Sequence, residues 1–275
     1  MPELPEVETV RKTLLELLPG RTIQAVDVRL SRIIKFPAVA EFQQRLVGQR
    51  FLDIRRRGKY LIFVLTADQA LVIHLRMTGQ LRVSADDEPE PKHTHVVFQL
   101  DCGRQLRFTD LRTFGAMYVA PLAEIAQIAG MDKLGWEPLA DFPLEDFATL
   151  LQRRTARIKS LLLDQRVIAG VGNIYADESL FQARIHPATP ANQLDFQQIA
   201  RLHRALVQVL QAGVDLRGTT FSDYVDGLGR SGDFQHQLCV YGREGQPCPS
   251  CGADIVRIKL GGRSAHLCPN CQRPH

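Results

Sequence analysis

The chain has 275 residues, of which 45% are hydrophobic and 23% are charged, and its net charge is +4 at pH 7. This composition excludes a disordered chain and allows two globular domains, each with its own core. Because the sequence has neither a basic segment before an apolar run nor an apolar run long enough to cross a bilayer, we expect a cytoplasmic protein without membrane contact.

The first residues predict a helix near the amino terminus. Pro5 suits the first turn of a helix, and apolar residues recur at helical spacing from Val7 to Leu18. Pro2 then lies at the start of this helix. If the initiator Met1 is removed, Pro2 presents a secondary amine, which is a nucleophile that can form an iminium with a carbonyl-like carbon.

Two carboxylates accompany this amine. Glu3 and Glu6 are three residues apart, so a helix places them on one face beside Pro2. One of them suits general acid-base catalysis, and the other suits an orienting role. An ordinary amphipathic helix with acidic residues in its first turn is the alternative interpretation.

Runs rich in valine, isoleucine and phenylalanine follow, and the short turn signals between them predict an antiparallel β-sandwich. A short helix, residues 39–46, interrupts the first two runs, and the acidic segment 85–91 is predicted to be a disordered hairpin tip. The predicted strands are residues 22–29, 51–57, 60–65, 70–75, 80–83, 95–100, 105–109 and 116–119.

The pattern changes to helical periodicity from about residue 121 onward, with residues 131–138 as the best linker. Residues 151–275 carry 15 Lys and Arg against 10 Asp and Glu, so this half is the better surface for a polyanion. The predicted helices of this half are residues 144–153, 156–163, 173–183 and 196–214.

Four of the six cysteines form two Cys-x-x-Cys pairs, Cys248 with Cys251 and Cys268 with Cys271. Two such pairs bring four thiolates together in a tetrahedron, so we expect one structural zinc ion without an open coordination position. A disulfide or a redox pair is the alternative.

A hairpin is predicted between the two cysteine pairs. Residues 255–260 and 263–267 have the composition of strands, and Gly261 and Gly262 form the turn between them. Arg263 stands next to this turn, where its guanidinium can hold a phosphate.

A glycine-rich turn precedes the helix predicted at residues 173–183. Gly170 and Gly172 allow tight backbone geometry, and Asn173 is a good N-cap residue. The free N–H groups at such a helix start can bind a phosphate. A turn between helices without a ligand is the alternative, because a lone Gly-x-Gly is a weak motif.

Further segments combine predicted turns with basic or apolar residues. Residues 55–60 form a basic turn, whose alternative role is to keep a sheet edge from pairing. Residues 74–79 and 110–115 carry apolar and basic side chains that either pack in the core or fill the space left by an extruded nucleotide. Residues 218–234 are long, polar and rich in glycine, as expected of a mobile lid or a disordered linker.

The segment from Pro2 to Val10 resembles the amino terminus of the formamidopyrimidine-DNA glycosylases (Fpg), and the resemblance continues in order to Cys271. It implies that Pro2 is the nucleophile, that Glu3 is the essential acid and that Glu6 is a supporting carboxylate. The cysteine pairs would then hold the one structural Zn²⁺ of the zinc finger in this family.

The same resemblance implies which residues contact DNA. Lys59, which we predict to belong to the catalytic residues with Pro2, Glu3 and Glu6, matches a residue that contacts the phosphate beside the lesion. Residues 218–234 match the segment that covers the flipped base. Three residues match those that fill the duplex after flipping, with Arg112 facing the unpaired base: Met77, Arg112 and Phe114. The remaining predicted DNA contacts are His74, Lys159, Gly172, Asn173, Tyr241 and Arg263. The Ser160-Leu161 pair after Lys159 departs from the Pro-Trp of many relatives.

The resemblance implies a two-domain α+β protein. Its predicted parts are an N-terminal two-layer antiparallel β-sandwich with flanking helices that carries catalysis (residues 1–130), a linker (131–138), a helix-two-turn-helix DNA-binding domain (139–235) and a C-terminal zinc-finger β-hairpin (236–275).

The implied function is base-excision repair by a monomer that associates with the bacterial nucleoid through DNA. Such an enzyme removes 8-oxoguanine and formamidopyrimidines from double-stranded DNA and cleaves abasic sites by β,δ-elimination through a Schiff base at the N-terminal proline. One alternative is an endonuclease VIII-like enzyme for oxidised pyrimidines, whose start has Gly where this chain has Leu4. The other is a zinc-ribbon DNA-binding protein without catalytic activity.

Overall fold

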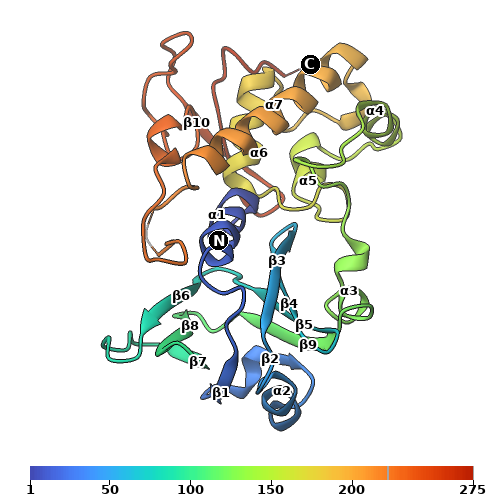
Figure 1. The fold of residues 1–275 in the computed structure, drawn as a ribbon. Helices are drawn as coiled ribbons and strands as arrows, with labels where there is room; N and C mark the ends of the chain where they lie inside the picture. The colour runs from blue at the N-terminus through green and yellow to red at the C-terminus, as the bar shows by residue number, and fades with distance from the viewer. Residues whose placement is uncertain (222, 275) are drawn as a thin grey trace. The chain divides into compact units, whose positions relative to one another are not determined.

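The computed structural model describes residues 1–221 and 223–274, and this part of the chain divides into two compact units (Figure 1). Unit 1 comprises Met1–Lys133 and Leu216–Gln235, and unit 2 comprises Leu134–Asp215 and the residues from 236 onward. The chain therefore leaves unit 1, forms the helices of unit 2 and returns to unit 1 before it completes unit 2.

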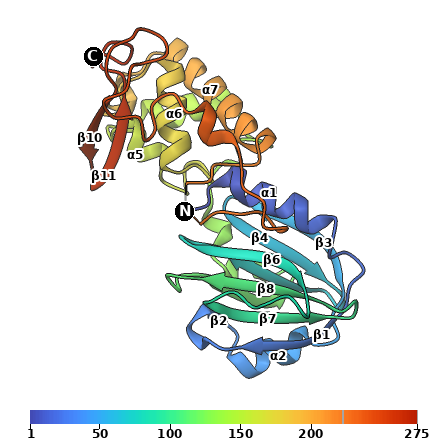
Figure 2. The ribbon, with the colours of Figure 1, turned by 90° about the vertical axis from the view of Figure 1, so that its left-hand side faces the viewer.

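Unit 1 is built on two β-sheets, which Figure 2 shows as layers. Its strands are β1 (Ile23–Val28), β2 (Ile34–Phe36), β3 (Phe51–Arg57), β4 (Tyr60–Leu65), β5 (Gln69–His74), β6 (Gly79–Ala85), β7 (Thr94–Leu100), β8 (Arg104–Asp110) and β9 (Ala116–Pro121). One sheet has the order β2-β9-β5-β4-β3, and the other has the order β1-β7-β8-β6. β2 and β9 are parallel, whereas the other neighbouring pairs are antiparallel. The inner faces of both sheets form one apolar core, which confirms the predicted sandwich.

Helix α1 (Leu4–Leu15) packs on β3 and β4, and its apolar side chains Val7, Val10 and Leu14 belong to the core of unit 1. Pro5 lies in its first turn, where a missing N–H group leaves no hydrogen bond unmade. The shorter helices of unit 1 are η1 (Ser31–Ile33), α2 (Val39–Leu46), α3 (Ile125–Ile128) and η2 (Met131–Lys133).

The segment after β6 differs from its prediction. β6 pairs with β8 and not with β7, so residues 85–91 are not a hairpin tip. The buried Arg107 on β8 donates hydrogen bonds to the carbonyl oxygens of Ala85 at 3.1 Å and Glu88 at 2.9 Å. These contacts give the acidic segment a defined path, which its composition did not indicate.

Unit 2 consists of helices followed by a β-hairpin. Its elements are α4 (Leu144–Gln152), α5 (Ile158–Leu162), α6 (Asn173–Ala183), η3 (Ala191–Gln193), α7 (Phe196–Asp215), β10 (Val256–Leu260) and β11 (Arg263–Leu267), with η4 (Phe234–Gln237) at the return of the chain from unit 1. α6 packs on α7 on one side and contacts β11 on another. A small apolar cluster, which includes Phe181 of α6, Val240 and Ile255, joins the cysteine-rich segment to the helices.

The contacts divide the chain differently from the predicted domains. Leu216–Gln235, which we assigned to the helical domain, packs with unit 1, and the first crossing between the units falls between Lys133 and Leu134, inside the predicted linker. The polar composition of this segment did not predict its return to unit 1, because the return depends on a few buried groups within a mostly polar segment.

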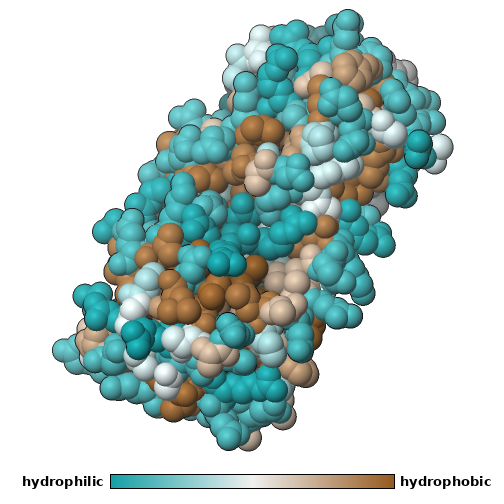
Figure 3. All heavy atoms as spheres, turned by 45° about the vertical axis from the view of Figure 1, so that its right-hand side comes forward, coloured by the Kyte–Doolittle hydropathy of each residue, from teal (hydrophilic) through white to brown (hydrophobic). Residues whose placement is uncertain are grey.

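The surface is mixed in character. On the face drawn in Figure 3, hydrophilic side chains predominate and apolar side chains gather in patches. Large apolar side chains that remain exposed in unit 1 include Met77, Leu111 and Phe114. Within the described ranges, no helix combines the length and the apolar character that crossing a membrane requires.

Candidate active site and nucleic-acid interface

The start of α1 holds the predicted catalytic residues, and it is buried. Pro2 precedes the helix, Glu3 is its N-cap residue at 3% exposure, and Glu6 lies one turn later at 2% exposure. Glu3 and Glu6 form a capping box, in which the Glu3 N–H donates to Glu6 Oε2 at 2.8 Å. The structure therefore brings Pro2, Glu3 and Glu6 together at one helix end.

The other carboxylate oxygen of Glu6 accepts a hydrogen bond from Leu216–Gln235, the segment in which the chain returns to unit 1 and which is called the returning segment below. The Thr219 N–H donates to Glu6 Oε1 at 2.7 Å, and Thr219 itself is buried. Gly218 next to it has φ +82°, and a Cβ at this position would crowd the Glu6 side chain. Glu6 thus bridges Glu3 and Thr219 through backbone N–H groups, and the predicted orienting role has a structural basis.

Two side chains of the returning segment anchor it on unit 1. The Tyr224 hydroxyl donates to the carbonyl oxygens of Glu6 at 3.3 Å and Arg217 at 3.1 Å. Burial, together with the negative charge of Glu6, raises the pKa of Tyr224 above its ordinary value, so the hydroxyl keeps its proton at neutral pH. Asp226 is fully buried and pairs with Arg217, which closes the segment on itself.

A partly buried ion pair links α1 to the end of β3, next to the basic turn between β3 and β4. Arg56 donates to Glu8 at 2.9 Å, and Arg11 donates to the same carboxylate at 2.7 Å. Burial alone would raise the pKa of Glu8, but the hydrogen bonds and charges of Arg11 and Arg56 outweigh it and hold this pKa below its ordinary value. Lys59 follows in the same turn and is only 5% exposed.

His74 lies beside this turn at the end of β5. Its ring packs edge-on against Tyr60, with the ring centroids 4.6 Å apart, and its Nδ1 accepts the Arg76 N–H at 2.9 Å. Burial, with the charges of Arg76 and Lys59, lowers the pKa of His74 to about 3. The ring is therefore neutral at pH 7, and its remaining proton is on Nε2.

The residues predicted to fill the duplex after flipping, here called the wedge residues, lie on two adjacent loops of unit 1. They are Met77, Arg112 and Phe114. Met77, between β5 and β6, is 39% exposed, and Phe114, between β8 and β9, is 52% exposed. The Arg112 guanidinium lies over the Phe114 ring, 4.8 Å from its centroid. Both loops meet at Asp110, which is fully buried and which the sequence analysis did not single out.

Lys159 occupies a different environment from the one its predicted role requires. It is 1% exposed, and its Nζ lies 2.6 Å from Asp177 Oδ1 and 2.6 Å from the carbonyl oxygen of Ser264, to which it donates. Asp177 also accepts the His266 N–H at 2.9 Å. Lys159 thus joins α5 to α6 and to β11, and the prediction that it grips the DNA backbone does not match this buried position.

The glycine-rich turn before α6 confirms the predicted helix start with one correction. Gly172 is the N-cap residue, and Asn173 is the first helical residue, so the prediction of Asn173 as N-cap is wrong. The Asn173 Oδ1 is buried without a hydrogen-bond partner in the described part of the chain. Gly172 itself is buried.

A second carboxylate that sequence analysis missed holds the start of the cysteine-rich segment. Glu178 on α6 is 5% exposed and accepts the backbone N–H groups of Cys239, Val240 and Tyr241 at 2.8 to 2.9 Å. The Tyr241 ring also packs edge-on against His266, with the centroids 4.9 Å apart. This fixes Tyr241 on the same side of α6 as β11.

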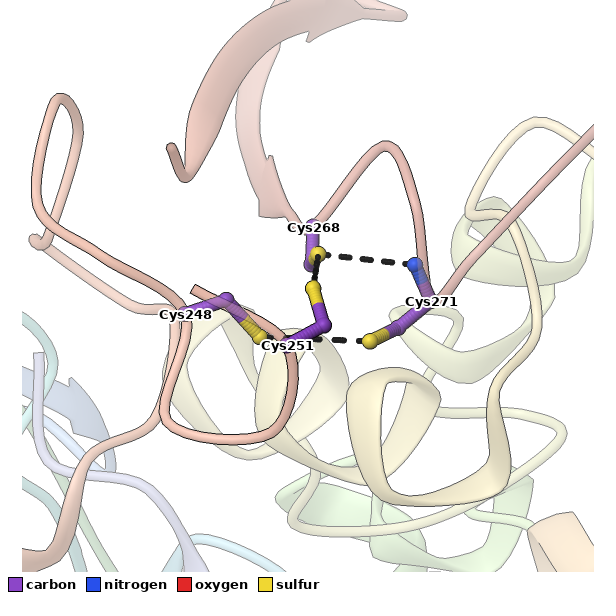
Figure 4. A group of neighbouring side chains, drawn as sticks. All are labelled: Cys248, Cys251, Cys268 and Cys271. Atoms are coloured by element: carbon purple, nitrogen blue, oxygen red, sulfur yellow. Dashed lines mark hydrogen bonds between the residues drawn. The ribbon is translucent and has the colours of Figure 1, made fainter. Parts of the chain in front are cut away.

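The predicted zinc ligands converge, as Figure 4 shows. The Sγ atoms of Cys248 and Cys271 are 3.9 Å apart, those of Cys251 and Cys268 are 3.4 Å apart, and all four lie within 4.8 Å of one another. A tetrahedral Zn²⁺ with Zn–S bonds of about 2.3 Å requires edges of about 3.8 Å. The cysteine residues therefore fit one structural zinc ion.

The hairpin between the cysteine pairs has the predicted form. Gly261 and Gly262 have φ +55° and +78°, and a two-residue type I′ hairpin turn requires positive φ at both positions. Leu260 pairs with Arg263 across this turn. Arg263 is exposed at the first position of β11. After the hairpin, the fully buried Gln272 joins the second cysteine pair to the helices. Its Oε1 accepts the Cys268 N–H at 2.9 Å, and its Nε2 donates to the Ile185 carbonyl oxygen at 2.9 Å.

Family models match the chain in three consecutive parts. Residues 1–117 match the formamidopyrimidine-DNA glycosylase N-terminal domain, residues 134–225 match its H2TH domain, and residues 245–274 match the zinc finger found in Fpg and IleRS. The formamidopyrimidine-DNA glycosylase of Pelotomaculum thermopropionicum is 49% identical over 99% of both chains. That of Desulforamulus reducens is 50% identical over the same shares.

The chain belongs to the formamidopyrimidine-DNA glycosylase family. Among solved structures, a Lactococcus lactis Fpg variant in complex with a Fapy-dG containing DNA gives a TM-score of 0.94 at 38% identity and covers 99% of this chain and 100% of its own. The Lactococcus lactis Fpg with an abasic site containing DNA gives 0.93 at 38% identity, with 98% and 99% covered.

Family membership confirms the predicted fold and activity. The chain is an Fpg enzyme of base-excision repair that acts on oxidised purines and abasic DNA, with both glycosylase and AP lyase activity. The non-catalytic zinc ribbon is thereby excluded, and the matching N-terminal domain favours Fpg over an endonuclease VIII-like enzyme.

Proposed function

We propose that Pro2, freed by removal of Met1, is the nucleophile of this Fpg enzyme. Its nitrogen attacks C1′ of the damaged nucleotide, the C1′–base bond breaks, and the departing base takes up the proton that the Pro2 nitrogen loses. Glu3 then protonates the ring oxygen, the C1′–O4′ bond opens, and the nitrogen lone pair forms the iminium. Loss of a C2′ proton expels the 3′ phosphate, and a second elimination expels the 5′ phosphate.

The arrangement around Glu6 supports this proposal. Both Glu6 carboxylate oxygens accept backbone N–H groups, one from Glu3 and one from Thr219, inside the buried start of α1. Such contacts fix the backbone that carries Pro2 and Glu3 without requiring a proton on Glu6. Glu6 therefore acts as a positioning residue, and Glu3 acts as the acid.

We further propose that the ligand is double-stranded DNA that contains an oxidised purine or an abasic site, bound by one copy of the chain. In unit 1, Lys59 and the neutral His74 contact the phosphate next to the flipped nucleotide. Met77 and Phe114 fill the space left in the stack, and Arg112 donates to the unpaired base.

In unit 2, we propose that Arg263, Tyr241, Gly172 and Asn173 contact the DNA backbone. Arg263 is exposed beside the turn of Gly261 and Gly262, and Gly172 and Asn173 lie at the start of α6, where the helix dipole favours a phosphate. Lys159 has the separate role of a brace, because its ammonium group pairs with Asp177 and holds the Ser264 carbonyl oxygen.

The experiment that tests Pro2 traps the iminium. Borohydride reduction during turnover should link the chain covalently to an abasic duplex and to an 8-oxoguanine duplex, and peptide mapping should place the bond at Pro2. A variant with a large residue inserted between Met1 and Pro2 keeps its initiator, so the Pro2 nitrogen is an amide. This variant should lose the crosslink and still bind DNA.

Glu3→Gln provides the matched comparison, because it keeps the nucleophile and removes the proton donor. We expect it to lose base excision while it retains cleavage at a ready-made abasic site, where the sugar already opens. A crosslink of equal yield in the extended variant, with the bond mapped to a lysine side chain, would instead identify a lysine nucleophile.

A further inference from the structure

Asp110 connects the two loops that carry the wedge residues. Its Oδ1 accepts the Thr78 hydroxyl at 2.6 Å and the Arg112 N–H at 3.2 Å, and its Oδ2 accepts the Gly115 N–H at 2.8 Å. Thr78 belongs to the loop of Met77, whereas Arg112 and Gly115 belong to the loop of Phe114. One fully buried carboxylate therefore fixes both loops.

The backbone of Asp110 adds to this connection. Its N–H donates to the His93 carbonyl oxygen at 3.0 Å, and its own carbonyl oxygen accepts the Thr113 N–H at 3.3 Å and is 2.9 Å from His95 Nε2. A turn formed by an aspartate alone would explain the contacts to Arg112 and Thr113. It would not explain the bond to Thr78, which is 32 residues away in the sequence.

The loops hold conformations that need such support. Arg76 and Thr113 both have φ +57°, in the left-handed region that non-glycine residues rarely adopt. The Thr78 hydroxyl donates to Asp110 and accepts the Arg112 N–H at 3.0 Å, so it links the two loops directly. The Arg112 backbone is thus held from two sides, while its guanidinium lies over the exposed Phe114 ring.

We propose that Asp110, acting with Thr78, is a positioning residue that determines opposite-base specificity. It sets the position of Arg112 and Phe114 relative to Met77, so that the wedge side chains enter the duplex as one body and Arg112 faces the unpaired base. This inference rests on the proposed role of the wedge residues. A misplaced Arg112 forms strained hydrogen bonds to the unpaired base. The binding energy of these bonds is available only after the nucleotide has flipped.

The test uses Thr78→Val, which removes the hydroxyl at nearly constant volume, with Thr78→Ser as the matched control that keeps it. For Thr78→Val we expect excision of 8-oxoguanine from duplex to fall about ten-fold. The difference in excision rate between duplexes with different bases opposite the lesion should narrow. Cleavage of an abasic single strand, which has no unpaired partner base, should stay within about two-fold. Thr78→Ser should retain the opposite-base preference.

A double-mutant cycle separates this inference from the proposed function. If Asp110 and Thr78 act through Arg112, adding Thr78→Val to Arg112→Ala should narrow the opposite-base preference no further. Additive effects, or an equal loss on the abasic single strand, would overturn the positioning role. If Arg112→Ala alone left the preference unchanged, the wedge assignment itself would fail. Amide hydrogen exchange at Arg112 and Gly115 in the DNA-free protein, which Thr78→Val should accelerate, tests the connection independently.

Discussion

The two units hold their candidate DNA-binding parts by means that overlap only in part. In unit 1, the buried carboxylates of Glu6 and Asp110 accept backbone N–H groups and a hydroxyl. In unit 2, the buried Glu178 also accepts backbone N–H groups. In addition, the buried Asp177 faces the Lys159 ammonium, and the cysteine cluster is suited to a metal ion. Neutral donors hold a loop over a wide range of pH and without a ligand, whereas an ion pair and a metal site depend on both partners being present.

The largest effect should come from removing one zinc ligand. Cys268→Ser should release zinc and abolish lesion-duplex binding, because the finger has only a small apolar cluster of its own and folds on its metal. Unit 1 should remain folded. Zinc content by mass spectrometry under native conditions, with hydrogen exchange resolved by residue, measures both. Normal binding by a zinc-free variant would show that the finger does not contribute.

Lys159→Met should have the next largest effect, since it leaves the Asp177 carboxylate buried without its cation. We expect a loss of about 3 kcal/mol in the free energy of unfolding. The double variant with Asp177→Leu should recover part of it. Denaturant titration measures the change.

The salt dependence of DNA binding tells whether Lys159 is a brace or a phosphate contact. A brace leaves the slope of log K against log salt unchanged, whereas Arg263→Gln, which removes an exposed guanidinium, should lower it by about one. An equal decrease in the slope for Lys159→Met would instead support the predicted phosphate contact of Lys159. It would also weaken the contrast between the units.

Glu6→Gln should have a smaller effect, confined to unit 1. Its amide has one acceptor oxygen where two N–H groups need acceptors, so either the contact with Glu3 or that with Thr219 is lost. Single-turnover excision should slow about ten-fold, with duplex binding unchanged. Glu41→Gln on α2, which removes an exposed carboxylate that pairs with Arg45, is the control and should leave the rate unchanged. Equal effects of the two variants would contradict the positioning role.

The effect that is smallest at pH 7 comes from His74, because its ring is mostly neutral there in both the folded and the unfolded chain. The pKa of His74 is about 3 in the folded chain and near 6.5 in the unfolded chain, so the unfolded state binds the extra proton between these values. The contribution of the neutral His74 ring to the free energy of unfolding is therefore fully present above about pH 6.5. It is lost as pH falls toward 3, by at most about 1.4 kcal/mol per pH unit. His74→Gln should show a shallower acid dependence in denaturant titrations at pH 4 to 7. A parallel dependence would mean that His74 titrates normally.

Sequence patterns predicted the regular elements well where the pattern was long. β3, β4, α2 and α6 have the predicted bounds, and turn signals such as Arg57-Gly58 and the glycine pair before Asn173 mark several of these ends. β2 was missed, since three residues before a proline give too little alternation to distinguish a strand.

The candidate site was predictable where chemistry depends on neighbouring residues, and not where it depends on distant ones. Glu3 and Glu6 share one helical turn, and the cysteine spacing alone indicates a metal. The burial of Lys159 depends on Asp177 and on Ser264. Ser264 lies 105 residues away in the sequence. Asp110 resembles any polar loop residue in the sequence, and only the fold shows that Thr78 lies against it.

The return of the chain to unit 1 has a consequence for the order of biosynthesis. A ribosome that has released the first 133 residues has produced both sheets and Glu6, but Thr219 and its N–H group do not yet exist. Because domains fold as their residues emerge, the sandwich is complete long before the Glu6 carboxylate acquires its second contact. The nascent enzyme therefore exposes an unfinished reaction centre until the whole of α7 has been made, and an isolated fragment of residues 1–133 should fold without the alignment that catalysis needs.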